Sequence, residues 1–256
     1  PESLPAEFDG ETVETRLQKA RDIIFGTEID VTKHFDVNIE FFYKKFVQLS
    51  NINRDKVYPD NGIYADKPDY LKKDFIIEEG KSYGADIVLK YEFKRLYLWA
   101  VYSLTFVDRY DGIRTYNPHF DRRHNVNLVG SYTFGKKLDW EFNARWNFGS
   151  GFPFSGTQGF YEYLNFSGGL YSDPITDNGQ LDYILGPLNE KRLPTYHRLD
   201  FSLKKTFVLS KNSNLEVTAS AINIYNRENI FYIDRIRDQR VNQLPFLPSL
   251  GASMTF

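Results

Sequence analysis

Histidines and neighbouring acidic residues are the first place to look for chemistry in this sequence. His119, Asp121 and His124 lie close together and, by residue type alone, suit a metal site. His119 and His124 are five positions apart, however, and this odd spacing places them on opposite faces of a strand. We therefore expect these residues to lie in a loop or at a rim, without a metal.

A second cluster carries the oxygen ligands that Ca²⁺ prefers: Asp173, Asp177, Asn178 and Asp182. An EF-hand loop has oxygen ligands at its first, third and fifth positions and glycine at its sixth. Counted from Asp173, Ile175 stands at the third position and Asn178 at the sixth. The stretch therefore fails as an EF-hand. We expect no cofactor, and weakly bound Ca²⁺ is the alternative left open.

Motifs for nucleophilic and phosphate chemistry are missing as well. Gly149, Ser150 and Gly151 form a segment too short for the G-x-S-x-G turn of a nucleophile elbow. These glycines, with Gly156, belong to no strand–loop–helix phosphate motif. The sequence has no cysteine, which excludes disulfides and thiolate metal sites. Since no pair of carboxylates stands out either, we expect no enzymatic activity.

Composition narrows the class of protein further. Aromatic residues make up 17% of the 256 residues, with 22 Phe and 18 Tyr. The charges nearly cancel, with 32 Lys and Arg against 34 Asp and Glu. Such a balance gives no general attraction to nucleic acid, so we expect no nucleic-acid partner. No run of about 18 apolar residues predicts a membrane-spanning helix.

Alternation with a period of two is the dominant pattern. Between Leu138 and Phe148 the apolar positions are Leu138, Trp140, Phe142, Ala144, Trp146 and Phe148, and the polar ones are Asp139, Glu141, Asn143, Arg145 and Asn147. A strand places alternate side chains on opposite faces, so one face here is apolar and the other is polar or charged. Residues 35–44, 85–93 and 125–134 repeat the split.

Nine strands follow from this pattern: about 17–31, 35–49, 82–93, 96–108, 122–134, 138–150, 195–208, 214–233 and 246–256. Short turns at 32–34, 94–95, 135–137 and 209–213 alternate with long loops at 50–81, 109–121, 151–194 and 234–245. Short turns at one end and long loops at the other are typical of an up-and-down transmembrane β-barrel, with periplasmic turns and extracellular loops.

A soluble β-sandwich or lipocalin-like barrel would also have alternating strands. The predicted strands, at about 12–14 residues, exceed the usual five or six. Charged residues opposite Trp140, Phe142 and Trp146 suit a wet lumen on one side and lipid on the other. The membrane barrel is therefore favoured. Because the first residues resemble no signal peptide, we expect the natural N-terminus upstream of Pro1.

Five segments resemble TonB-dependent outer-membrane receptors of the Bacteroidetes type: YNPHFDRRHNVNLVGSYTF (116–134), WNFGSGFPFSG (146–156), RLPTYHRLDFSLKKTF (192–207), ASAINIYNRENIFY (219–232) and LPSLGASMTF (247–256). That family has a 22-stranded barrel closed by an N-terminal plug domain. The resemblance implies that residues 1–256 are the C-terminal portion of one all-β barrel domain. The plug domain, the TonB box and the earlier strands are absent from this chain.

The resemblance also implies a function and partners. We expect active transport, across the bacterial outer membrane, of a nutrient such as a siderophore, cobalamin, glycan or peptide. The expected partners are outer-membrane lipid, the remaining barrel strands, the TonB complex (through the missing N-terminal part) and a surface lipoprotein. Phe256 is similar to the terminal signal read by the barrel-assembly machinery. A passive porin or a component of an outer-membrane assembly is the alternative, and a soluble glycan-binding protein is a third reading.

Aromatic residues of the long loops are the candidate ligand contacts, because such rings stack on sugars or hold a partner protein. The six selected are Tyr116, Phe152, Phe154, Tyr161, Tyr163 and Tyr171. Tyr58, Tyr64, Phe160 and Tyr183 lie in the same kind of loop. The competing interpretation places these rings in an aromatic girdle at the membrane interface or in packing within the loops.

Overall fold

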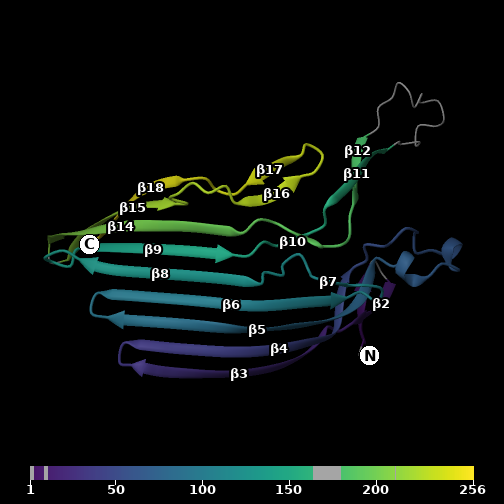
Figure 1. The fold of residues 1–256 in the computed structure, drawn as a ribbon, viewed down its shortest axis with the longest axis horizontal. Coiled ribbons are helices and arrows are strands. Elements are labelled where there is room, and N and C mark those ends of the chain that lie inside the picture. The colour runs from purple at the N-terminus through teal and green to yellow at the C-terminus, as the bar shows by residue number, and fades with distance from the viewer. Residues whose placement is uncertain (1–2, 9–10, 164–179, 211) are drawn as a thin grey trace.

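Nine long strands form one antiparallel sheet in which each strand pairs with the next long strand in the chain (Figure 1). The computed structural model describes residues 3–8, 11–163, 180–210 and 212–256. In spatial order the strands are β3 (Lys19–Thr32), β4 (Phe35–Ile52), β5 (Phe75–Phe93), β6 (Leu96–Tyr110), β8 (His124–Phe134), β9 (Trp140–Gly149), β14 (Tyr196–Ser210), β15 (Ser213–Ile222) and β18 (Leu247–Thr255). The predicted all-β, up-and-down fold is confirmed.

The connections between the long strands contain shorter elements. The short strands are β1 (Ser3–Phe8), β2 (Glu11–Arg16), β7 (Thr115–Tyr116), β10 (Pro153–Phe154), β11 (Thr157–Tyr163), β12 (Gln180–Leu185), β13 (Lys191–Arg192), β16 (Ile230–Asp234) and β17 (Gln239–Asn242). Two 3₁₀ turns, η1 (Gly62–Tyr64) and η2 (Asp69–Leu71), lie between β4 and β5. Among the described residues, no helix is long and apolar enough to cross a membrane.

The connections separate by length, as predicted. Short turns at 33–34, 94–95 and 135–139 gather at one end of the sheet, on the left in Figure 1, where β14 also ends and β15 begins. Connections 53–74, 111–123, 150–195 and 223–246 leave from the other end. Lys94 and Leu138 accommodate their tight turns with φ angles of 55° and 56°.

Two predicted strands and the N-terminal region need correction. The strand predicted at 82–93 begins earlier, at Phe75. The strand predicted at 214–233 is wrong beyond Ile222, where the chain leaves the sheet and Ile230–Asp234 pairs with β17 instead. Asn223 and Asn226 cause the exit, because their φ angles of 54° and 50° are incompatible with a strand. Residues 3–8 and 11–16, for which no strand was predicted, pair with each other as β1 and β2.

The register between strands builds one apolar and one polar face. Phe142 of β9 lies opposite Tyr132 of β8 and Leu203 of β14. One residue earlier, Glu141 lies opposite Lys204 on the other face, and their side chains form an ion pair of 2.9 Å. Since residues on one face alternate with those on the other, this register extends both faces across neighbouring strands.

The apolar face has no cover within the described structure. Phe25, Leu250 and Phe256 are 72%, 78% and 91% exposed. The chain exposes 18367 Å², against roughly 11,700 Å² for a compact soluble protein of 30.0 kDa. A sheet of this kind needs an apolar environment to cover it, because its buried core is too small to stabilise it in water. Among the residues that the structure describes, the buried hydrophobic ones are Leu49, Val107, Tyr116 and Ala221.

A bulge in β4 changes which residues face the polar side near the long connections. The pairing between β4 and β5 is regular up to Phe46, shifts, and resumes with Leu49 opposite Glu78. Before the shift Lys44 lies on the polar face, whereas after it Asn51 shares that face with Glu78. A bulge inserts an extra residue and so re-aims the side chains that follow.

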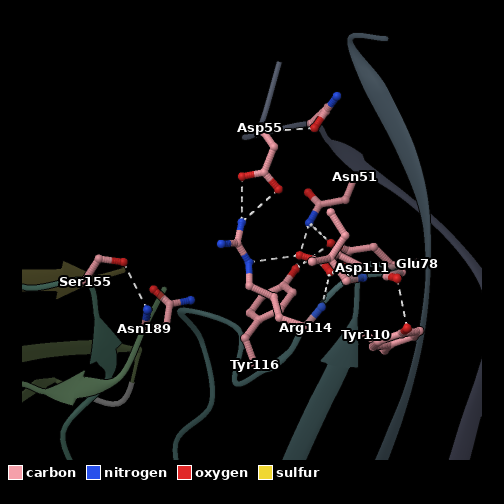
Figure 2. A network of polar contacts seen from close by, with 12 residues as sticks. Asn51, Asp55, Glu78, Tyr110, Asp111, Arg114, Tyr116, Ser155 and Asn189 are labelled. Atoms are coloured by element: carbon pink, nitrogen blue, oxygen red, sulfur yellow. Dashed lines mark hydrogen bonds and ion pairs between the residues drawn. The ribbon is translucent and has the colours of Figure 1, made fainter. Parts of the chain in front are cut away.

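The re-aimed Asn51 takes part in a network that anchors the connection 111–123 (Figure 2). Glu78 is 1% exposed, and its Oε1 accepts hydrogen bonds from Tyr116 Oη at 2.6 Å and Asn51 Nδ2 at 3.0 Å. Arg109 pairs with the other carboxylate oxygen at 3.3 Å. Burial and then the hydrogen bond to Glu78 raise the pKa of the Tyr116 hydroxyl, so it remains a donor at neutral pH. The buried carboxylate is therefore paired and hydrogen-bonded.

A second buried carboxylate fixes the connection 150–195. Asp121 has no exposed surface and pairs with Arg192 of β13. Arg192 also donates to the backbone oxygen of Gly151 at 3.1 Å. Farther along this connection, the Asn189 N–H donates to Ser155 Oγ at 3.0 Å (Figure 2). These bonds hold segments that enter and leave the long connection against the end of the sheet.

Asparagines hold the hairpin of β16 and β17. Asn223 is fully buried, and its Nδ2 donates to the backbone oxygens of Arg227 at 2.9 Å and Leu244 at 3.0 Å. Asn229 exchanges two hydrogen bonds with the backbone of His197, at 2.9 and 3.1 Å. Both asparagines are thus structural, because Asn229 pins the connection to the start of β14 and Asn223 ties the two ends of the connection together.

The two faces can be separated by a pair of substitutions in β9. Ala144→Arg places a charge on the apolar face near the middle of the strand, and we expect it to cost about 2–4 kcal/mol in lipid. Asn143→Arg, on the polar face, should be much milder. Urea unfolding in lipid vesicles measures both costs. Equal destabilisation by the two variants would contradict the assignment of the faces.

The anchoring network predicts a second contrast. Glu78→Gln removes the charge that pairs with Arg109, and we expect a loss of about 1–3 kcal/mol, the cost of unsatisfied buried polar groups. Cleavage within 111–123 under limited proteolysis should also accelerate, because Tyr116 loses its carboxylate acceptor. Glu79→Gln is the matched control, since Glu79 is the exposed neighbour on the other face. Similar cleavage rates in both variants would argue against the anchor.

Candidate functional site

Two adjoining cavities lie at the end of the sheet that carries the long connections. The larger, of about 710 Å³, lies between the start of β14 and the β16–β17 hairpin. The smaller, of about 300 Å³, runs along β8, β9 and β14. Arg122, Phe152, Tyr196 and Gln243 line both cavities. We call the two cavities together the rim recess.

Arg122 lies in the wall common to both cavities and packs against aromatic rings. Its guanidinium carbon is 4.1 Å from the ring centroid of Phe152 and 5.6 Å from that of Tyr196. A cation so close to a ring is attracted by the negative face of the π system. These contacts orient the planar guanidinium, although the three residues come from distant parts of the chain.

Gly149 makes this position accessible to Arg122. A Cβ atom at Gly149 would lie 2.5 Å from the Arg122 Nη1 atom and 2.6 Å from its Nε atom, closer than atoms can approach without a shift. The glycine ends β9, and its missing side chain leaves space for the guanidinium.

The electrostatics of the recess are positive. Burial lowers the pKa of Arg122 from its ordinary value, because the charged form is partly removed from water. The lowering reflects a desolvated cation, and an arginine remains protonated at neutral pH. Its Nε atom is buried and has no hydrogen-bond partner among the described residues. Arg145 and Arg198 add two further guanidinium groups to the smaller cavity.

Neutral amides complete the lining of the smaller cavity. Asn125, Asn127 and Asn147 lie on the polar face of β8 and β9, and Asn147 donates to the side-chain oxygen of Asn127. Arg198 pairs with Asp200 at 2.8 Å. A convergent set of guanidinium and amide donors can bind oxygen atoms of a polar ligand.

The structure brings one predicted ligand residue, Phe152, into the rim recess. Tyr116 is 6% exposed, and its hydroxyl donates to Glu78. This side chain therefore anchors the connection 111–123. Phe154 lines a separate cavity of about 510 Å³ near β11 and β16. Tyr161 is exposed and donates to Asp182 at 3.1 Å. A role of these rings in ligand contact stays a prediction.

The remaining two candidates are Tyr163 and Tyr171. Tyr163 ends β11, and only its backbone belongs to the description. Tyr171 lies outside the described residues, as do Asp173, Asp177 and Asn178 of the acidic stretch considered for Ca²⁺.

The histidines have neighbours other than metal ligands. His124 Nδ1 lies 2.9 Å from the hydroxyl of Tyr102, and His197 Nδ1 lies 2.8 Å from that of Tyr225. His119 packs edge-on against Phe120. Within the described ranges, no cluster of three or more His, Cys, Asp or Glu side chains could hold a metal ion.

Arg122, Gly149 and Tyr196 were not among the predicted site residues. The available signal was the pair Arg122-Arg123 directly before a strand that starts beside the long connections, with Gly149 ending the next strand. The pattern alone does not show which aromatic rings would meet this arginine.

Comparisons with known proteins give structural similarity only. No protein-family model matches the sequence, and no curated protein is similar to it. Solved structures of outer-membrane receptors do match the fold, at sequence identities that support a likeness of fold alone.

Three of these structures illustrate the likeness. The unliganded ferric citrate transporter FecA has a TM-score of 0.59 and 15% identity, covering 93% of this chain and 31% of its own. The ferripyoverdine receptor of the outer membrane of Pseudomonas aeruginosa has a TM-score of 0.58 and 11% identity, covering 99% and 29%. The ferric-catecholate import receptor Fiu from E. coli K12 has a TM-score of 0.57 and 14% identity, covering 100% and 30%.

The extent of the match defines what this chain resembles. It spans about a third of the length of these receptors, and its nine long strands follow one another without a crossover. The chain therefore has the fold of a section of the barrel domain of TonB-dependent receptors.

Proposed function

We propose that residues 1–256 are the C-terminal part of the β-barrel of a TonB-dependent receptor that imports a nutrient across the bacterial outer membrane. The observation that carries the proposal is the uncovered apolar face, on which Phe25 and Leu250 are more than 70% exposed. Lipid is the environment that stabilises such a face, and a closed barrel is the β-structure that spans it. The likeness to receptor barrels over 93–100% of this chain supports the same reading.

The edges of the sheet support a larger barrel. In the described chain, β3 and β18 each pair with a strand on one side only. An unpaired backbone N–H or C=O group costs several kcal/mol in hydrocarbon, so two free edges are unstable in lipid. We propose that the remaining strands, a plug domain and a TonB box belong to the same receptor.

The substrate class is proposed more broadly. The similar structures are named for ferric citrate, ferripyoverdine and a ferric-catecholate. We therefore propose iron–siderophore complexes as the first substrate class for this chain, with cobalamin, glycans and peptides as the other classes. The polar face would line the transport path, and the long connections would meet the ligand first.

Partners follow from this assignment. One similar structure is a complex of FpvAI with pyocin S2. For this chain we propose outer-membrane lipid, the TonB complex, the barrel-assembly machinery through Phe256 and a surface lipoprotein. The Bacteroidetes type of the receptor is also proposed, on the five sequence segments that resemble it.

Growth tests the proposed transport. We expect the full-length receptor to be required for growth on one limiting nutrient, which is an iron–siderophore, cobalamin, a glycan or a peptide. Growth on that nutrient should also require TonB. Deleting either gene should abolish growth on the same nutrient, whereas high nutrient concentrations that bypass the receptor serve as the control. Growth that needs the receptor but not TonB would contradict active transport and indicate a passive porin.

Topology gives an independent test, because this chain has no cysteine. In a full-length receptor without other cysteines, Arg237→Cys lies beyond β16 on the side of the long connections, and Lys136→Cys lies in a short turn. A membrane-impermeant maleimide added to intact cells should label Arg237→Cys alone. Lys136→Cys should react after the outer membrane is broken. The reverse pattern would invert the orientation.

A further inference from the structure

We propose that the rim recess contains a subsite for an oxyanion group, a carboxylate or a phosphate, carried by the small-molecule ligand of this receptor. The inference rests on the proposed function and deepens it, because it assigns a chemical group to the ligand. Arg122 is the residue that we propose to contact this group, and Arg145 adds positive charge beside it.

An imbalance of charge is the first observation. The smaller cavity is lined by three arginines and by no acidic residue, and the larger by three arginines and Glu228. Arg122 and Arg145 form no ion pair with any residue that the structure describes. Arg122 is half-buried, whereas Arg145 is exposed. A partly desolvated cation such as Arg122 is costly without a partner, and an anionic ligand would remove that cost.

Elsewhere on the polar face, cations do have carboxylate partners. Lys204 pairs with Glu141 at 2.9 Å, and Lys44 pairs with Asp22 at 3.2 Å. Arg198, in the smaller cavity itself, pairs with Asp200. The unpaired charge is therefore a local property of the recess and not a general property of the polar face.

The fixed orientation of Arg122 is the second observation. The guanidinium lies against the ring of Phe152, near that of Tyr196, and occupies the space that a side chain at Gly149 would fill. A planar guanidinium held in this way loses little freedom when it binds a planar carboxylate or a phosphate through two parallel hydrogen bonds. Such preorganisation is typical of a binding site.

The neutral hydrogen-bond donors and the volume of the recess indicate what kind of ligand it would bind. The amide oxygen of Asn127 accepts from Asn147, which leaves the Asn127 amide N–H groups to donate to a ligand. Cavities of about 710 and 300 Å³ fall in the range for small molecules rather than macromolecules. An oxyanion beside Arg122, with the rest of the ligand toward the β16–β17 hairpin, would fill this space.

The test uses the detergent-purified full-length receptor and isothermal titration calorimetry. Pyrophosphate supplies a phosphate oxyanion, succinate a carboxylate, and glucose serves as the neutral control. We expect at least one of the two anions to bind at a single saturable site, and glucose to give no binding that depends on Arg122. Arg122→Gln should weaken the anion by about tenfold or more, as expected for a lost charge-assisted hydrogen-bonded pair.

Two further variants separate position from charge. Gly149→Ala keeps the charge but moves the guanidinium, because the added Cβ would meet the flexible end of Arg122. It should weaken the anion about as much as Arg122→Gln. Lys90→Gln removes a cation of the polar face that lines neither cavity and should change the affinity less than about twofold. Heat-modifiability on gels confirms that each variant is folded.

The outcomes distinguish the subsite from the proposed function. Equal anion affinities of the parent, Arg122→Gln and Gly149→Ala proteins, or no anion binding by the parent, would overturn the subsite even if growth requires TonB. Loss of affinity in both variants supports the subsite even if transport proves to be passive. Binding of phosphate but not carboxylate, or the reverse, decides which of the two groups the ligand carries.

Discussion

Phe142 lies opposite Tyr132 on one side and Leu203 on the other, and this hydrogen-bonded register underlies the rest of the structure. A slip of one residue at any of the eight ladders would turn charged side chains toward the apolar face, because successive residues point to opposite sides. The register also brings Glu141 to Lys204. Since the sheet buries few apolar side chains, its backbone pairing, and the environment that covers the apolar face, must supply the stability that a soluble protein obtains from its core.

Departures from regular pairing create the features of the rim. The shift in β4 turns Asn51 toward Glu78, and the positive φ angles at Asn223 and Asn226 take the chain out of β15 and into the hairpin. Each departure is stabilised by a buried polar group whose hydrogen bonds are supplied locally, by Tyr116 for Glu78 and by backbone groups for Asn223. Hydrogen bonds of buried polar groups therefore stabilise the rim, as apolar packing stabilises a soluble domain.

Much of the sheet could be predicted from the sequence, because a period of two directly encodes which residues share a face. The early start of β5 was missed, since residues 75–81 lack that clean alternation and Glu78 is buried through contacts that the pattern cannot show. The exit at Asn223 was missed because apolar residues continue beyond it. The rim recess could not be predicted, because Arg122, Gly149 and Tyr196 converge from three segments, and only the register of β8, β9 and β14 decides that they meet.

The chain-order pairing of the strands has a consequence for assembly and for divergence. Since each ladder joins successive long strands, the sheet can grow hairpin by hairpin, each new strand using its predecessor as a template and meeting it through local encounters. The long connections add little entropic penalty to this growth, because each doubling of loop length costs only about 0.6 kcal/mol. Lengthening or shortening the connection 150–195 would therefore leave the stability of the ladder between β9 and β14 nearly unaffected, so that the segments at this end can vary in length and sequence while the sheet stays the same.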